Sequence, residues 1–177
     1  MFRTLLLLLF RNRLPRIEAL EIIHTHIRVW PTDCDFNIHL TNSRYSSLLD
    51  LARTQYFIQI NSLPKFVGGG WKSVLSSQSI SFIKEIKPLE KVDIETRVLS
   101  WDRKYCYIEH RFLVADQLHA KALARVAFIK GRRVRAFDKL LIELNDATAI
   151  GSPAEPEQVT AWLQLLKAKK KNVVTES

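Results

Sequence analysis

The stretch between residues 71 and 130 constrains the fold most, because its side chains change character at every second position. Over residues 92–98, for example, apolar or small side chains alternate with Asp93, Glu95 and Arg97, which is typical of a strand with one buried face. Comparable patterns predict strands over 74–86, 106–114 and 120–130. Because short turns join these four strands, we expect an antiparallel meander.

One strand and one long helix precede the four strands. Residues 22–30 alternate between apolar and polar side chains and end at Pro31, which predicts a strand. A helix is expected next, and Asn42 or Ser43 is expected to cap its start. Its apolar stripe consists of Tyr45, Leu48, Leu49, Ala52 and Tyr56. Further apolar residues lie off this stripe, so the order predicts an α+β domain with an antiparallel sheet wrapped around one long central helix.

The length of 177 residues suits one domain with extended ends. We divide the chain into a basic and apolar helical extension (1–21), the sheet-and-helix domain (22–145) and a C-terminal helix with a basic tail (146–177). Lys and Arg number 27 against 18 Asp and Glu, a formal net charge of +9, which favours anionic partners. The basic residues gather at the termini and in one loop rather than beside aromatic residues on a strand face. We therefore expect no nucleic-acid partner.

An apolar run, Leu5–Leu9, lies near the N-terminus between Arg3 and Arg11. It is too short to span a bilayer, which takes roughly 20 residues, and no small-residue cleavage site follows it, which disfavours a signal peptide. Two interpretations stay open. The run forms a helix packed on its own domain or on a partner, or it forms a helix lying on an anionic membrane surface.

Two carboxylates, a histidine and an asparagine are concentrated between Trp30 and Tyr45, directly before the predicted central helix. The first turn of a helix has unpaired backbone N–H groups and a partial positive charge. Such donors polarise the carbonyl of a thioester and stabilise the oxyanion that forms on attack. A carboxylate beside them acts as a nucleophile or activates a water molecule. The segment therefore predicts a site for thioester cleavage.

This segment resembles the signature of hotdog-fold thioesterases of the 4-hydroxybenzoyl-CoA thioesterase type, and the order of elements is similar to that family over residues 22–130. The second Asp of the family's Asp-x-Asp falls on Asp35, and the other matching positions are His39, Asn42 and Tyr45. Thr41 stands where the family usually has the first of two Asn residues. The strand sequence over residues 107–112 is also similar to that of a thioesterase-like branch of the family.

The resemblance implies a hotdog fold and an acyl-CoA thioesterase in which Asp35 is the catalytic carboxylate, either as general base or as nucleophile. It implies that His39, Asn42 and Tyr45 contact the substrate. It also implies a homodimer or homotetramer, because the neighbouring subunit completes the site in this family. No cofactor is implied, since coenzyme A is part of the substrate.

Other roles for these residues stay open. Asp33 and Asp35 are of a type that caps turns before helices, and we assign Asp33 to orienting the turn. A structural role in the loop is favoured for His39, and Asn42 serves first as a cap or brace. Thr41 keeps open a different function, a non-catalytic acyl-CoA or lipid-binding protein on the same fold. A dehydratase is disfavoured, because hotdog dehydratases use another residue pattern.

A basic cluster follows the last predicted strand and consists of Lys130, Arg132, Arg133, Arg135 and Lys139. Arginine matches the geometry of phosphate oxygens, so Arg132, Arg133 and Arg135 are candidates for binding the phosphates of coenzyme A. A solvated loop explains the same charges. The lysines near the C-terminus are interpreted as a solvated tail.

The remaining histidines and cysteines are weaker candidates. His24 and His26 share a strand face, but no third ligand is expected in register, so we predict no metal site. His110 lies on the apolar face of its strand and is interpreted as a core histidine with satisfied hydrogen bonds. Cys34 has no histidine partner for thiol catalysis. Together with Cys106 it indicates a reducing compartment, so we expect a cytoplasmic protein with membrane association left open.

Overall fold

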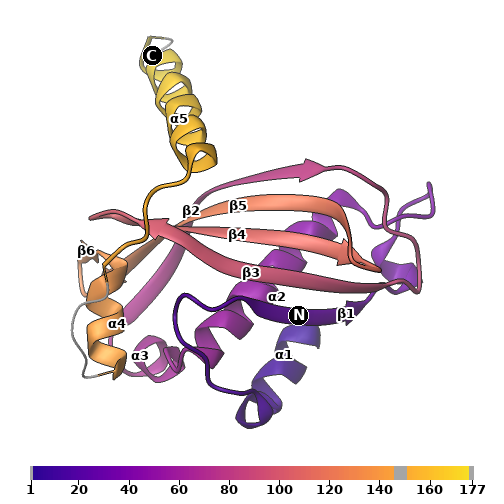
Figure 1. The fold of residues 1–177 in the computed structure, drawn as a ribbon, viewed down its shortest axis with the longest axis horizontal. Coiled ribbons are helices and arrows are strands. Elements are labelled where there is room, and N and C mark those ends of the chain that lie inside the picture. Colours follow the sequence, from indigo (N-terminus) through magenta and orange to yellow (C-terminus); the bar gives the residue numbers. More distant parts are fainter. Residues whose placement is uncertain (1, 146–150, 176–177) are drawn as a thin grey trace.

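The computed structural model describes residues 2–145 and 151–175. One antiparallel sheet curves around the long helix α2 (Asn42–Gln59) (Figure 1). In spatial order the strands are β1 (Ile23–Arg28), β3 (Lys91–Trp101), β4 (Tyr105–Val114), β5 (Gln117–Lys130) and β2 (Trp71–Phe82). The other elements are α1 (Phe2–Leu9), η1 (Arg11–Arg13), η2 (Pro31–Asp33), α3 (Leu63–Val67), β6 (Arg133–Arg135), α4 (Phe137–Asn145) and α5 (Glu157–Thr175). The predicted α+β arrangement of a sheet around one central helix is confirmed.

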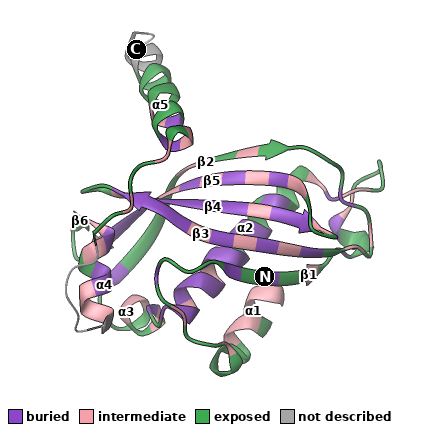
Figure 2. Cartoon of the chain, viewed as in Figure 1, coloured by how far each residue is buried: buried purple, intermediate pink, exposed green. Residues whose placement is uncertain are grey.

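The predicted meander of four strands is correct only for β3, β4 and β5. β2 pairs with β5 and not with β3, while β3 pairs with β1. The connection over residues 83–90 is too long for a tight hairpin and contains Pro88, so the chain crosses to the other part of the sheet. Within the part of the chain that the structure describes, β2 is therefore an edge strand with one unpaired side, and most of its residues are exposed (Figure 2).

Helix α2 is buried on most sides, which explains why its apolar residues do not keep to one stripe. Leu49 packs with Phe112 in the core cluster near the start of the helix, and Tyr56 lies in a second cluster near its end. Polar residues are enclosed as well. Gln55, for example, donates a hydrogen bond to the carbonyl oxygen of His24 at 3.0 Å. The C-terminal half of α2 is thus enclosed, and the exposed residues of the helix lie between Asn42 and Asp50.

The two faces of β4 separate as the alternation predicts. Even-numbered residues of this strand face α2, whereas Tyr107 packs on the opposite face against Val159 and Trp162 of α5. On this outer face the buried carboxylate of Glu109 lies 2.9 Å from Nζ of Lys121. The first turns of α5 therefore cover the sheet, and the rest of the helix projects away from it (Figure 1).

His110 points from β4 into the core, but its hydrogen bonds are not all satisfied, which corrects the interpretation from the sequence. Its Nδ1 lies 2.7 Å from Oγ1 of Thr96, whereas its Nε2 is buried without a partner among the described residues. Burial, aided by the positive charge of Arg53, holds the pKa of His110 well below its ordinary value. The imidazole is therefore neutral in the folded protein.

The ends of the chain are helical where they are described. No helix among residues 2–145 and 151–175 is long and apolar enough to cross a bilayer. The expected C-terminal helix forms as α5. Residues 146–150, where the C-terminal unit was placed to begin, lie outside the described residues, and the division into 1–21, 22–145 and 146–177 stays a prediction.

We expect the free energy of unfolding to decrease as the pH falls below about 6.5, because the unfolded chain protonates His110 and the folded chain does not. One such group changes stability by roughly 1.4 kcal/mol per pH unit in that range. Urea denaturation between about pH 7.5 and pH 5.5 measures the slope. The variant His110→Gln flattens it, whereas His26→Gln at an exposed position leaves it in place. An unchanged slope in His110→Gln would contradict this account.

Candidate active site

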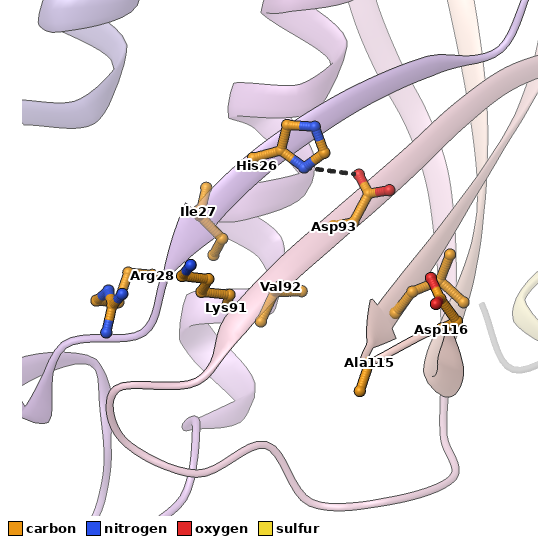
Figure 3. Close-up of a pocket in the computed structure, with 9 residues that line it drawn as sticks. His26, Ile27, Arg28, Lys91, Val92, Asp93, Ala115 and Asp116 are labelled. Atoms are coloured by element: carbon orange, nitrogen blue, oxygen red, sulfur yellow. Dashed lines mark ion pairs between the residues drawn. The ribbon is translucent and has the colours of Figure 1, made fainter.

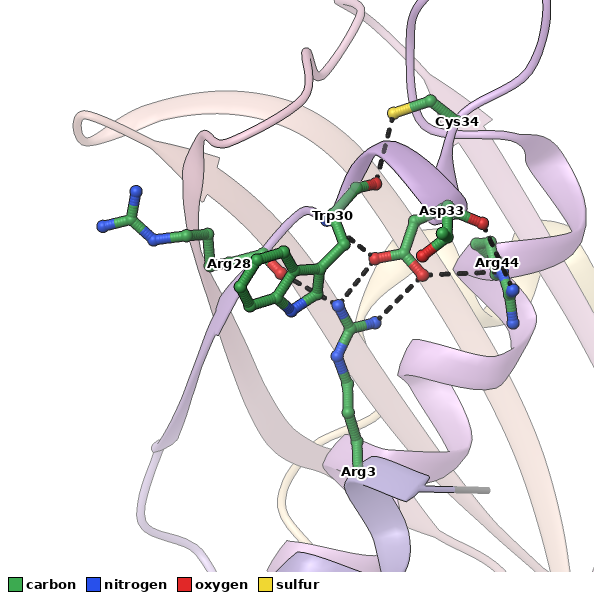
Figure 4. Close-up of polar contacts among 7 residues, drawn as sticks. Arg3, Arg28, Trp30, Asp33, Cys34 and Arg44 are labelled. Carbon is green, nitrogen blue, oxygen red and sulfur yellow. Dashed lines mark hydrogen bonds and ion pairs between the residues drawn. The ribbon is translucent and has the colours of Figure 1, made fainter.

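The loop between β1 and α2 is held by the carboxylate of Asp33 (Figure 4). Its Oδ2 accepts hydrogen bonds from Nη2 of Arg3 at 2.6 Å and from the backbone N–H of Trp30 at 2.9 Å. Its Oδ1 lies 3.5 Å from Nε of Arg44, in the first turn of α2. The backbone carbonyl of Asp33 accepts the N–H of Thr41 at 3.0 Å. Asp33 therefore joins α1, the end of β1 and the start of α2.

The charge of Asp33 is stabilised although the residue is buried. Burial alone would raise the pKa of this carboxyl group. The hydrogen bonds from Arg3 and Trp30, with the positive charges of Arg3 and Arg44, outweigh burial and hold the pKa below its ordinary value. The carboxylate is thus ionised and fully engaged at neutral pH, which agrees with a role in orienting the loop.

Asp35, the predicted catalytic residue, lies further along the same loop, and its side chain is 35% exposed. Its Oδ1 accepts the backbone N–H of Asn37 at 2.9 Å and lies 3.7 Å from Nδ1 of His39. Its backbone N–H donates to the carbonyl oxygen of His39 at 3.1 Å. One carboxylate oxygen therefore caps the turn, as the alternative interpretation expects. The other, Oδ2, forms no hydrogen bond with a described residue.

A surface hollow of about 250 Å³ lies beside the start of α2. The three predicted substrate contacts, His39, Asn42 and Tyr45, all line it. The wall opposite is made by the end of β2 and the residues that follow it: Phe82, Ile83, Lys84 and Glu85. Asp35 does not line the hollow itself. It reaches the rim through its neighbour His39.

The first turn of α2 has no side-chain cap. The helix begins at Asn42, and Thr41 occupies the cap position without a side-chain hydrogen bond. The predicted cap at Asn42 or Ser43 is therefore wrong by one or two residues. The backbone N–H groups of Asn42 and Ser43 have no acceptor within the helix, since the first N–H groups of a helix lack a preceding turn. Asn42, the first of these residues, lines the hollow.

Tyr45 serves mainly as a wall of the hollow. It is buried, and its ring packs edge-on against Phe82 at 4.9 Å between centroids and in tilted contact with Phe112 at 5.0 Å. Burial raises the pKa of Tyr45 to about 12, so its hydroxyl keeps its proton at neutral pH. A proton-abstracting role for Tyr45 does not fit this environment.

Exposed apolar side chains that the sequence analysis did not select surround the site. Phe36 and Ile38 at the tip of the loop have relative exposures of 105% and 69%. Phe82 and Ile83 are about half exposed at the end of β2. Ile38 adopts a φ of 63°, a left-handed conformation that is strained for a β-branched residue. The sequence signal that could have identified Phe36 and Ile38 was the presence of apolar residues inside an otherwise polar turn.

The basic cluster lies at the other end of the sheet from Asp35. Its arginines are on or beside β6, which pairs with the last residues of β5 next to Trp71 of β2, whereas the hollow lies next to Phe82. The 12 residues of β2 separate these ends by roughly 36 Å. Within one chain, the predicted phosphate contacts Arg132, Arg133 and Arg135 are therefore not brought to the candidate catalytic residue, because the strands between them are long.

A larger hollow, of about 490 Å³, lies along β1 and β3 (Figure 3). His26 lines it, with its Nδ1 3.4 Å from Oδ1 of Asp93. Nδ1 of His24 lies 2.6 Å from the other oxygen of Asp93. Asp93, on the neighbouring strand, is therefore in contact with both histidines. Even so, no three His, Cys, Asp or Glu side chains of the described residues form a group that could hold a metal ion.

Cys34 is poorly suited to nucleophilic attack. Burial and the negative charges of Asp33 and Asp35 raise the pKa of its thiol. Both cysteines are free, and Cys106 is buried in the core. The sulfur chemistry that the sequence disfavoured gains no support from this geometry.

A curved sheet around one helix, with a hollow at the uncapped start of that helix, defines a hotdog-fold thioester hydrolase. The chain belongs to the Thioesterase-like superfamily, whose family model matches residues 29–163. The predicted hotdog fold, the resemblance to this family and the class of thioester hydrolase are confirmed.

Individual relatives agree with this family. The chain is 29% identical to Protein THEM6 of Xenopus laevis over 84% of its own length and 70% of that protein. It is 27% identical to the probable thioesterase atnL of Emericella nidulans, over 81% of this chain and 62% of that protein. A 4-hydroxybenzoyl-CoA thioesterase mutant crystallised with 4-hydroxybenzoyl-CoA superimposes with a TM-score of 0.61 and 25% identity, over 70% of this chain and 97% of that one.

We expect Asp33→Asn to lower the free energy of unfolding by about 1–3 kcal/mol, because Arg3 and the N–H of Trp30 lose a charged acceptor. Arg3→Met removes the same contact from the other side. The double variant should therefore be little less stable than the more damaging single variant. Urea denaturation of the four proteins measures this coupling, with Asp116→Asn in an exposed turn as control. Additive losses would show that the two residues act independently.

Proposed function

We propose that the protein hydrolyses acyl-CoA thioesters in the hollow beside the start of α2, with Asp35 as the catalytic carboxylate. The observation that supports this most is a juxtaposition at one place. His39 and the uncapped first residue of α2, Asn42, line one hollow with the apolar side chains of Phe82 and Ile83. Asp35 lies beside this hollow, with its Oδ1 3.7 Å from Nδ1 of His39. This combination supplies a base or nucleophile, oxyanion donors and a surface for an acyl group.

In the proposed reaction the thioester carbonyl oxygen accepts hydrogen bonds from the N–H groups of Asn42 and Ser43. Asp35 takes a proton from a water molecule that attacks the carbonyl carbon, or attacks this carbon itself. The C–S bond then breaks, and the coenzyme A thiolate leaves and takes up a proton. After attack by water the acyl group is released directly as a carboxylate, whereas after attack by Asp35 a water molecule must first hydrolyse the mixed anhydride between the acyl group and Asp35. His39 contacts the substrate or keeps the carboxylate of Asp35 in position.

The exposed edge of β2 supports a homodimer. No described strand pairs with the second side of its 12 residues, and a long unpaired edge is usually covered by another chain. Val74 and Leu75 on this strand and Phe82 at its end are exposed apolar residues. Two copies related by a two-fold axis would pair β2 with β2 in antiparallel orientation. A homotetramer is then formed only if a second surface also associates.

Antiparallel pairing resolves the separation of the arginines from Asp35. It sets the Trp71 end of one β2 next to the Phe82 end of the other, so the basic cluster of the partner comes beside the hollow. Arg132, Arg133 and Arg135 form no ion pair with a described carboxylate and are free to bind phosphate groups. We therefore propose that the partner subunit supplies these contacts to the phosphates of coenzyme A.

We expect Asp35→Asn to lower kcat by about 10²–10⁴, because the amide can neither accept a proton nor attack the carbonyl. Release of free thiol from a panel of short, long and aromatic acyl-CoA substrates measures the activity. Asp116→Asn in the turn between β4 and β5 is a matched control that keeps wild-type rates.

Two results would contradict the proposal. Full activity of Asp35→Asn would show that Asp35 is not the catalytic residue, although the protein would still be a thioesterase. Binding of acyl-CoA without turnover by the wild type would instead identify an acyl-CoA-binding protein, the alternative function on this fold.

A mixing experiment tests the shared site. Asp35→Asn and the triple variant Arg132→Ala, Arg133→Ala, Arg135→Ala each have weakened sites as homodimers. In a mixed dimer, one of the two sites contains both the intact Asp35 and the intact arginines. Complete subunit exchange should therefore restore about one quarter of wild-type activity at substrate concentrations below KM.

The controls for mixing follow from the same arithmetic. A mixture of Asp35→Asn with the wild type is the first control. It shows whether subunits exchange and whether activity falls in proportion to the fraction of Asp35→Asn subunits. No recovery in the mixture of the two variants, despite exchange, would place the arginines in the same chain's site or outside any site.

Location and cofactor needs remain proposals. Both cysteines are free, which agrees with the reducing, cytoplasmic environment expected from the sequence. The expectation that the reaction needs no cofactor apart from the coenzyme A of its substrate stays a prediction.

A further inference from the structure

We propose that the outer face of α1 docks on an anionic lipid bilayer. This face, called the α1 face below, consists of Leu5, Leu9 and Phe10. Their side chains have relative exposures of 56%, 66% and 50%. Three neighbouring large apolar residues at the surface are more than the scattered exposure that is normal for a folded protein.

The α1 face is presented by a helix that is fixed to the domain. On the inner side of α1, Leu7 packs against the core cluster around the start of α2. Arg3 is held by Asp33, as described above, and its Nη2 also donates to the carbonyl oxygen of Arg28 at 2.9 Å. Because these contacts use the inner side, the apolar residues on the outer side are left over. They are available to an external partner.

The charges next to the α1 face favour an anionic partner. Arg11, Arg13 and Arg16 follow the helix and are exposed, and no acidic residue precedes Glu18 in the chain. The guanidinium carbon of Arg13 lies 5.0 Å from the ring centroid of Phe10. Such a pair combines an apolar body with a charged head, which suits the boundary between acyl chains and lipid phosphates.

The dimensions of α1 indicate a shallow contact. Its 8 residues extend over roughly 12 Å, far less than the roughly 30 Å hydrocarbon core of a bilayer. The apolar residues lie along the side of the helix rather than around it. The helix therefore lies in the interface, with its arginines at the depth of the phosphate groups.

A second copy of the chain is a poorer occupant of this face. A two-fold contact through the α1 face would bring the arginines of one chain next to those of the other, and like charges across a contact are costly. The proposed dimer uses the edge of β2, on a different part of the domain. A lipid surface satisfies both the apolar residues and the excess of positive charge.

Sedimentation of the full-length protein with lipid vesicles tests this proposal. We expect binding to phosphatidylcholine vesicles that contain phosphatidylserine, weaker binding to pure phosphatidylcholine, and a further loss at high salt. Leu5→Ser with Leu9→Ser should weaken binding by at least about tenfold. Arg11→Gln with Arg13→Gln should weaken binding only to the anionic vesicles, by about fivefold per arginine.

The matched control is Leu165→Ser, which alters an exposed leucine on α5 and should leave vesicle binding unchanged. Unaltered thermal unfolding of each variant shows that the fold is intact. Failure of the wild type to sediment with anionic vesicles, or equal binding by Leu5→Ser with Leu9→Ser, would overturn the proposal. A change in oligomeric state on size exclusion caused by the same variant would identify a second copy as the occupant and would also overturn it.

Discussion

The enclosure of α2 by a single curved sheet is the constraint from which the other features follow. The C-terminal half of this helix is enclosed, so ligands reach it chiefly through the exposed residues between Asn42 and Asp50. At the N-terminal end the unpaired N–H groups lie close to low-dielectric protein, where their electrostatic effect on a substrate is stronger than in water. The loop that delivers the chain to this end therefore carries both the anchor, Asp33, and the reactive carboxylate, Asp35.

The sequence contained the local part of this arrangement. Alternation over residues 92–98 defined β3 and its buried face, and the spacing from Asp35 to Tyr45 located the start of the helix to within two residues. Pairing between distant strands was not readable in the same way. The position of β2 beside β5 depends on the path of residues 83–90 around the sheet, and no periodicity reports such a path.

In the candidate site, too, the local features were readable in the sequence and the contacts between distant segments were not. His39, Asn42 and Tyr45, which were selected through the family resemblance, are near each other in the chain and line one hollow. The arginines after β5 are also well marked in the sequence, but their distance from Asp35 depends on strand length and on which end of the sheet they occupy. The contact between Arg3 and Asp33 joins residues 30 positions apart. Nothing in either segment alone indicates this pairing.

That contact has a consequence for how such chains can diverge. An ionised carboxylate in a buried position is tolerated because a cation from the N-terminal helix neutralises it. A descendant that lost this helix would retain the charge with only the more distant Arg44 as its counterion, and selection would favour a neutral residue at position 33. Helix α1 and an acidic residue at position 33 are therefore expected to be inherited together. Among relatives, an acidic residue at this position would then indicate that the N-terminal helix is present.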